Sequence, residues 1–232
     1  MERSRAIQEL VEMISELHLE HPVRVGIDGV DCSGKTKLAD EMVHLLQSTG
    51  RQVIRASLDG FHNPSSTRHQ QGHYSPRGYY EDSFDLDSLL KCLLLPLGPG
   101  GNRRCQVSRF DFIKDKPSES IWITASATGI LIFEGVFLHK PELINHWDFT
   151  IFVDSSFETT VQRALKRDRY LFGSEEEIRK RYYERYTPGQ RIYLDSCNPA
   201  EKADAVFRND KIDFPTLAIN RKMPESQAPC GR

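Results

Sequence analysis

The chain has 232 residues and a formal net charge of −2, which allows one α/β domain with a sizeable core and gives no general attraction to nucleic acid or to an anionic membrane. Its five cysteines include no C-x-x-C pair, so we expect reduced thiols in a cytoplasmic protein, with no zinc knuckle or disulfide framework. The most apolar stretches, Leu89–Leu97 and Ile130–Leu138, are too short to span a bilayer.

In chain order, residues 3–19 place apolar side chains at helical spacing and predict an amphipathic helix. Five short apolar runs predict strands, at Val23–Asp28, Gln52–Leu58, Ile130–Phe133, Phe149–Val153 and Ala205–Phe207. Helical patterns separate most of these runs, around residues 86–95, 157–167 and 174–186. The alternation predicts a three-layer α/β fold, with a mostly parallel five-stranded sheet and helices on both faces. Ligands of such sheets bind at the carboxyl ends of the strands.

Two segments fall outside this alternation. Residues 60–120 are rich in Gly, Pro, Arg and aromatic residues, and we expect a substrate-binding insertion there because ordinary loops are shorter. Within it, Arg104–Phe112 is predicted to form one arm of a hairpin. Residues 1–220 are expected to form a single domain, and residues 221–232, with two prolines and a glycine, a disordered tail.

The segment Gly29–Thr36 matches G-x-x-x-x-G-K-[ST] without a mismatch. It follows a predicted strand and precedes a helical pattern, which is the context of a P-loop that binds a nucleoside triphosphate. We expect Lys35 to reach the β and γ phosphates of ATP, and the Thr36 hydroxyl to coordinate Mg²⁺. The other loop residues expected to bind the cofactor are Gly29, Asp31, Cys32, Ser33 and Gly34. Cys32 either points away from the phosphates or, beside Lys35 and a helix N-terminus, is a low-pKa thiolate.

A phosphate loop alone does not separate a kinase from a GTPase switch. The sequence has neither the N-K-x-D motif that reads guanine nor a D-x-x-G motif after the third predicted strand, which argues against a switch. A small-molecule kinase needs a carboxylate to accept the proton of the attacking hydroxyl, and cations over the transferred phosphoryl group. Asp59, at the end of the second predicted strand, suits the first role. A cationic lid at about residues 163–185, with Arg163, Arg167 and Arg169, suits the second.

Six short motifs extend this pattern over roughly residues 22–210: Gly29–Thr36, Ser57–Phe61, Phe84–Asp87, Phe110–Phe112, Phe133–Gly135 and Arg163–Asp168. Their order resembles that in uridine kinases, within a wider group that includes phosphoribulokinase and bacterial pantothenate kinase. The chain looks most similar to bacterial uridine kinase-like proteins with a D-G-F-H-N-P segment, here Asp59–Pro64. The resemblance implies that Asp59 is the catalytic base for a ribose 5′-hydroxyl and that Asp85 binds ribose hydroxyls. It also implies that Glu134 supports the Mg²⁺ site and that Arg163 and Arg167 contact phosphates.

The chain departs from uridine kinases where the base would bind. It has Phe110 where they carry a tyrosine, Asp115 where they carry a base-contacting histidine, and His62 near a position where they carry a tyrosine. The resemblance therefore implies no particular base pocket. The candidate residues for binding the acceptor in and near the insertion are Phe61, His62, Arg77, Tyr79 and Phe110. Their rings and guanidinium group suit stacking on a base or hydrogen bonding to it.

These observations predict ATP-dependent, Mg²⁺-assisted phosphorylation of a hydroxyl on a small molecule. The favoured acceptor is the 5′-hydroxyl of a nucleoside such as uridine or cytidine. One alternative is a kinase for another small alcohol, such as pantothenate, a sugar phosphate or nicotinamide riboside. Another is a nucleotide-binding regulatory protein that no longer transfers phosphate. The sequence leaves open whether the protein forms a homo-oligomer and whether the donor is ATP or GTP.

Overall fold

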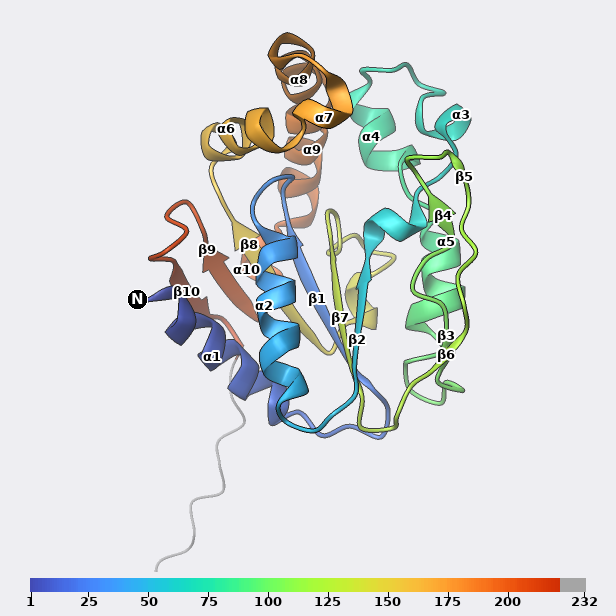
Figure 1. Cartoon of the computed structure of the whole chain (residues 1–232), viewed down its shortest axis with the longest axis vertical. Helices are drawn as coiled ribbons and strands as arrows, with labels where there is room; N and C mark the ends of the chain where they lie inside the picture. The colour runs from blue at the N-terminus through green and yellow to red at the C-terminus, as the bar shows by residue number, and fades with distance from the viewer. Residues whose placement is uncertain (222–232) are drawn as a thin grey trace, which may run out of the picture.

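The computed structural model describes residues 1–221, so residues 222–232 of the predicted disordered tail lie outside the described residues. A six-stranded sheet forms the centre of the molecule, in the order β10-β9-β8-β1-β7-β2 (Figure 1). Its strands are β1 (Val23–Gly29), β2 (Val53–Ser57), β7 (Ile130–Gly135), β8 (Phe149–Asp154), β9 (Ala205–Arg208) and β10 (Thr216–Ile219). Five strands are parallel to their neighbours, and β10 runs antiparallel to β9.

The expected mostly parallel sheet is therefore confirmed, but the predicted number of five strands is wrong by one. The missing strand is β10, which has only four residues and lies half-buried at the sheet edge. Such an edge strand lacks the continuous apolar run that reveals a buried parallel strand. The first helix, α1 (Arg3–Ser15), is also shorter than the predicted residues 3–19.

One face of the sheet is covered by α1 and by α2 (Lys35–Gln47), which lie side by side in front of the strands in Figure 1. Their apolar stripes pack on alternate residues of β1, β7, β8 and β9. The stripe of α1 repeats every three or four residues, as an amphipathic surface helix requires. This face positions the phosphate loop, because α2 begins directly after the loop.

The opposite face of the sheet packs against the insertion and against the long helix that follows the lid. Here Trp147 lies flat on β1. A Cβ atom added at Gly26 would come within 2.9 Å of the indole ring, so the glycine is required by the close approach. The Trp147 indole also stacks near Phe133 at 5.4 Å and donates from Nε1 to the Leu138 carbonyl at 3.0 Å. With helices on both faces, the sheet is the middle of three layers.

The insertion is a set of short elements beside β2. Its helical part comprises η1 (Leu58–Phe61), α3 (Ser65–Arg68), α4 (Pro76–Asp82), α5 (Leu86–Leu89) and the π-helical turn η2 (Leu90–Leu94). Two small antiparallel ladders follow, β3 (Arg104–Cys105) with β6 (Ile123–Thr124) and β4 (Phe110–Asp111) with β5 (Lys116–Pro117). The segment Arg104–Phe112 is thus not one continuous hairpin arm, since its two ends pair with different strands.

The lid region projects beyond the carboxyl ends of the strands, as Figure 1 shows at the top of the molecule. It contains α6 (Phe157–Arg167), α7 (Arg169–Phe172) and α8 (Glu175–Arg181). From α8 the chain continues through a π-helical turn, η4 (Tyr182–Tyr186), into α9 (Thr187–Cys197). These three elements form one long helix that joins the lid to the core. The remaining elements are η3 (Ile144–His146) and α10 (Pro199–Lys202). Over residues 1–221, no helix combines the length and the apolar character needed to cross a membrane.

The packing of α1 makes a prediction about stability. Leu10 belongs to α1 and is fully buried, whereas Leu19, beyond the end of the helix, is 41% exposed. Leu10→Ala should lower the free energy of unfolding by about 2–5 kcal/mol, because it leaves a cavity in the core. The matched change Leu19→Ala should cost about 0.5 kcal/mol or less. Urea denaturation of the two variants measures both values, and equal losses would show that α1 does not pack as described.

Candidate active site

The phosphate loop curls because three of its residues adopt positive φ angles. These are +152° at Gly29, +58° at Cys32 and +103° at Gly34. A Cβ atom at Gly29 would lie 2.5 Å from the Val153 carbonyl oxygen, and one at Gly34 would collide with the Asn209 amide. Only glycine fits at these two positions, and the motif spacing follows from this requirement.

The loop is held from behind by Arg163 and Asn209. The Arg163 guanidinium donates to the carbonyls of Cys32 at 3.4 Å and Ser33 at 3.2 Å, and to the Asn209 carbonyl at 2.6 Å. The Asn209 side-chain amide donates to the same Ser33 carbonyl at 2.7 Å. Arg163 was expected to contact phosphates from the lid, but in this structure it lies behind the loop and does not line the cleft.

The front of the loop fits a triphosphate. The amide groups of Cys32, Gly34 and Lys35 donate to no acceptor within residues 1–221. Over the same residues the Ser33 hydroxyl is buried without a hydrogen-bond partner. Lys35 Nζ donates to the Val30 carbonyl at 2.8 Å, so its ammonium lies over the loop. A curled backbone with unpaired amides, the start of α2 and a lysine is the donor set that a phosphate chain needs.

Thr36 and Glu134 are the residues that could hold Mg²⁺. Both line the cleft, and the carboxylate of Glu134, the last residue but one of β7, lies 3.3 Å from Arg55. Hydroxyl and carboxylate oxygens suit this hard cation. No group of three or more His, Cys, Asp or Glu side chains within residues 1–221 is arranged to bind a metal.

The phosphate loop opens into a cleft of about 290 Å³ at the carboxyl edge of the sheet. Of the residues expected to form the site, the structure brings eight together in its lining: Asp31, Lys35, Thr36, Asp59, His62, Tyr79, Glu134 and Arg167. They come from the phosphate loop, the insertion, β7 and the lid. Residues that are far apart in sequence therefore meet at the predicted edge.

Asp59 lies in η1, directly after β2, where the Ser57 hydroxyl accepts from its backbone amide at 3.3 Å. Solvent reaches its carboxyl group from the cleft, although protein surrounds the group on most sides. Burial, together with the negative charges of Glu134 and Asp31, raises the pKa of Asp59 to about 6, while Lys35 and Arg167 act in the opposite sense. A carboxylate with such a pKa is ionised at neutral pH and has the basicity to accept a proton.

An aromatic wall of three rings stands next to Asp59. The His62 ring lies 4.6 Å from the ring of Phe84 and stacks on Phe112 at 4.8 Å, and all three residues line the cleft. Burial lowers the pKa of His62 to about 4, so its ring is neutral at pH 7. Neutral aromatic rings that line a cleft can pack against an unsaturated ring of a ligand.

On the lid side, Arg167 enters the cleft from the end of α6. It donates to the buried carboxylate of Asp168, from Nε at 2.6 Å and from a terminal nitrogen at 3.3 Å. Asp168 also accepts from the Tyr182 hydroxyl at 2.9 Å. The guanidinium is thereby oriented by a partner that is itself anchored on the long helix.

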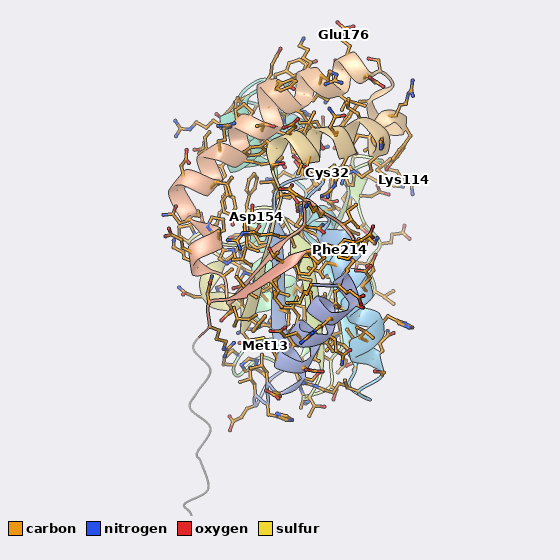
Figure 2. All side chains as sticks on the ribbon, turned by 90° about the vertical axis from the view of Figure 1, so that its left-hand side faces the viewer. Met13, Cys32, Lys114, Asp154, Glu176 and Phe214 are labelled. Atoms are coloured by element: carbon orange, nitrogen blue, oxygen red, sulfur yellow. The ribbon has the colours of Figure 1, made fainter. Side chains whose placement is uncertain are left out.

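Cys32 is enclosed between the loop and the lid helices, and Figure 2 shows it beneath them. Its Sγ lies 3.4 Å from the Tyr182 hydroxyl oxygen. Burial raises the pKa of the Cys32 thiol to about 11. The thiol is thus protonated at neutral pH, which argues against the low-pKa thiolate interpretation.

Five further expected site residues do not line the cleft. Phe61 is fully buried in the core, and Phe110 lies in β4. Arg77 pairs with Glu81 on the surface of α4 at 2.8 Å, and Arg169 is exposed.

The fifth is Asp85. Its carboxylate caps α5, accepting from the Ser88 backbone amide at 2.9 Å and from the Ser88 hydroxyl at 2.6 Å. In this structure its oxygens are therefore engaged away from the site.

Several residues of the site were not found by the sequence reasoning. Those in the cleft include Phe84, Phe112, Asp168, Tyr182 and Tyr186. The first three stand inside the recognised motifs, and the two tyrosines are spaced i, i+4 in a predicted helix. The i, i+4 spacing places the two tyrosines on one face of the helix, and this was the signal that could have identified them.

Behind the loop, the missed residues are Asp28, His139 and Tyr193. The fully buried Asp28 carboxylate accepts from the Gly29 amide at 2.7 Å, bonds His139 Nδ1 at 2.6 Å and also accepts from the Tyr193 hydroxyl. This buried network ties β1 to α9. No spacing rule in the sequence joins these three positions.

A curled phosphate loop at the edge of a parallel sheet, with a carboxylate and an arginine facing it, defines the class of P-loop kinases that act on small molecules. A sequence profile of the Phosphoribulokinase / Uridine kinase family matches residues 24–211, and the chain belongs to this family.

Relatives agree with this placement, and solved structures share the fold. The chain is 26% identical to uridine-cytidine kinase B of Dictyostelium discoideum over 91% of this chain and 86% of that protein. It is 25% identical to uridine/cytidine kinase UKL1 of Arabidopsis thaliana over 64% of this chain, but it spans only 30% of that protein. The fold is similar to that of a possible uridine kinase from Bacillus stearothermophilus, with a TM-score of 0.69 at 23% identity, covering 89% and 99% of the two chains. A putative fructose transport system kinase from Silicibacter sp. has a TM-score of 0.66 at 20% identity, with 84% and 95% covered.

The surroundings of Cys32 predict slow alkylation. With a pKa of about 11, about one thiol in a thousand is ionised at pH 8, and the side chain is buried. Iodoacetamide should therefore modify the more accessible Cys92 well before Cys32 in the folded protein. Peptide mapping by mass spectrometry measures both rates, with the unfolded chain as the control in which both react. Equal rates in the folded protein would contradict the enclosed position of Cys32.

Proposed function

We propose that this protein transfers the γ-phosphoryl group of ATP to a hydroxyl of a small molecule, with the 5′-hydroxyl of a nucleoside such as uridine or cytidine as the favoured acceptor. The observation that carries the proposal is Asp59, a carboxylate with a pKa of about 6 in the same cleft as Lys35 and Thr36. Binding a nucleotide does not require this group, whereas transfer to a hydroxyl does.

The residues of the cleft divide into those that hold the donor and those that act on the acceptor. The loop amides, Lys35 and Arg167 would hold the phosphates and stabilise charge on the transferred group. Mg²⁺, held by Thr36 and Glu134, would neutralise charge between the phosphates when bound. The oxygen of the acceptor hydroxyl forms a bond to the γ phosphorus, and Asp59 accepts the proton that this hydroxyl loses. The bond from that phosphorus to the bridging oxygen breaks, and its electron pair leaves with ADP.

A nucleoside is favoured because three aromatic rings line the cleft beside Asp59. The rings of His62, Phe84 and Phe112 offer a stacking surface, and Asp59 lies next to them. A nucleoside has a flat ring joined to a sugar that carries a primary hydroxyl, so it can occupy both features at once. The family resemblance and the named activities of the relatives support the same acceptor class.

The proposal is tested by measuring ADP release with a panel of candidate acceptors. The panel contains uridine, cytidine, other nucleosides, pantothenate, sugar phosphates and nicotinamide riboside. We expect the largest stimulation with a pyrimidine nucleoside. A larger response to pantothenate or to a sugar phosphate would replace the nucleoside by that acceptor. If no hydroxyl compound stimulates release, the protein is a nucleotide-binding regulator and the kinase proposal is wrong.

Removing the charge of Asp59 tests its role as the base. Asp59→Asn should lower kcat by about 10²–10⁴-fold, because the amide cannot accept the proton. Its affinity for ATP should change by no more than about twofold, since Asp59 is not part of the phosphate donor set. Asp195→Asn, on the exposed face of α9, is the matched control and should leave kcat unchanged. A similar kcat in both variants would remove Asp59 from the mechanism.

The raised pKa of Asp59 also predicts a pH profile. The base works only when ionised, so activity is present above its pKa of about 6 and is lost as the pH falls through that value. At saturating ATP and Mg²⁺, kcat/KM for the acceptor should be level near pH 8 and fall about tenfold per unit well below pH 6. A profile that stays level down to about pH 5 would contradict this assignment.

A further inference from the structure

Asp31 is an unusual residue for a phosphate cradle. It occupies the third position of the loop motif, it is half-buried, and it lines the cleft. A carboxylate repels phosphate oxygens, so its charge does not assist in holding the donor. Its contacts show what else it faces.

The Asp31 carboxylate is fixed by two buried donors. Its Oδ2 atom accepts from the Tyr79 hydroxyl at 2.7 Å and from the Gln190 side-chain amide at 2.6 Å. Tyr79 is 6% exposed and Gln190 is 2% exposed. Tyr79 comes from α4 in the insertion and Gln190 from α9. The carboxylate is therefore turned toward the wall that these two helices form.

The two donors cannot move far, because α4 and α9 are in close contact. A Cβ atom at Gly189 would lie 2.7 Å from the Pro76 carbonyl oxygen and 2.8 Å from Cδ1 of Tyr79. There is no space between the helices at the residue next to Gln190. Asp31 is thus held in one orientation by a rigid support, which is how a binding group is preorganised.

The second carboxylate oxygen of Asp31 remains available. Oδ1 accepts no hydrogen bond from any group of residues 1–221. The charge of Asp31 is close enough to Asp59 to contribute to the raised pKa of that group, so the two carboxylates face neighbouring parts of one cleft. Asp85, the residue implied by family resemblance to bind sugar hydroxyls, is engaged with Ser88.

We infer that Oδ1 of Asp31 accepts a hydrogen bond from a second hydroxyl of the acceptor, adjacent to the hydroxyl that Asp59 activates. The acceptor is therefore a polyhydroxylated molecule, and Asp31 is the residue that selects for it. This inference rests on the proposed function, since it concerns the acceptor of that transfer. The side chain at the third position of the loop motif would then bind the acceptor, while the loop backbone binds the donor.

The first test separates recognition from a merely structural role. In Asp31→Asn, the amide oxygen can still accept from Tyr79 and Gln190, so the support is kept and only the negatively charged oxygen is replaced. We expect the KM for the acceptor to rise about tenfold or more, as for the loss of a hydrogen bond to a charged group. The KM for ATP should stay the same or fall, and kcat should change by less than about threefold.

Tyr79→Phe is the companion variant, because it removes one support and leaves Oδ1 in place. If Asp31 serves only to join the helices, Asp31→Asn should behave as the wild type while Tyr79→Phe is impaired, and the inference is then wrong. A rise in both KM values together with a lower melting temperature in Asp31→Asn would mean that the loop is damaged, which also overturns it. Thermal unfolding and ATP binding are measured for both variants.

The second test removes the hydroxyl from the acceptor. With the best acceptor of the panel and its monodeoxy analogues, the wild type should lose about tenfold in kcat/KM for one analogue. Asp31→Asn should lose little on that same change, because the interaction is already absent. Equal losses in both proteins would exclude Asp31 as the partner of that hydroxyl. If the wild type transfers to no hydroxyl compound, the proposed function fails first and this inference fails with it. If the wild type transfers phosphate and Asp31→Asn has unchanged kinetics, the inference is wrong while the proposed function stands.

Discussion

The carbonyl oxygen of Ser33 is the atom on which the site depends. It accepts from the Asn209 amide at 2.7 Å, from Arg163 at 3.2 Å and from the Ser155 hydroxyl at 3.4 Å. These donors come from the ends of β9 and β8 and from α6, on the side away from the cleft. With this carbonyl held backward, the following amides turn forward, toward the cleft. Without that constraint, the glycines would let the loop adopt many conformations, and the anion site would not be preformed.

The cleft beside this loop contains more acidic than basic side chains. Four carboxylates line the cleft, those of Asp31, Asp59, Glu134 and Asp168, against two cations, Lys35 and Arg167. The partners of these carboxylates differ, since Glu134 pairs with Arg55 and Asp168 with Arg167, whereas Asp31 bonds the neutral Tyr79 and Gln190. Within residues 1–221, Asp59 forms no ion pair and its carboxylate accepts no hydrogen bond. Burial and the neighbouring charges of Glu134 and Asp31 raise the pKa of Asp59, which suits a carboxylate that serves as a base.

The features that could be predicted from the sequence are those that short segments determine. The loop, the five parallel strands and Asp59 follow from local motifs, and eight of the expected site residues do meet in one cleft. Helical spacing placed Arg163 and Arg167 on one face, but it could not tell that one guanidinium reaches behind the loop and the other into the cleft. Asp85 looked like a ligand-binding residue, yet it caps the helix that starts beside it, because a local hydrogen bond to Ser88 competes with a distant one. The Asp28–His139–Tyr193 network joins positions more than a hundred residues apart, and no periodicity encodes it.

The packing of Trp147 on Gly26 has a spectroscopic consequence. The chain has two tryptophans. Trp147 is 9% exposed in the core, while Trp122 is 51% exposed in the insertion with the Arg104 guanidinium 5.0 Å above its ring. Neither lines the cleft. The two indoles therefore emit from very different surroundings, and a water-soluble quencher will distinguish them. The emission that the quencher does not reach comes from Trp147 and reports the integrity of the sheet on which this indole packs.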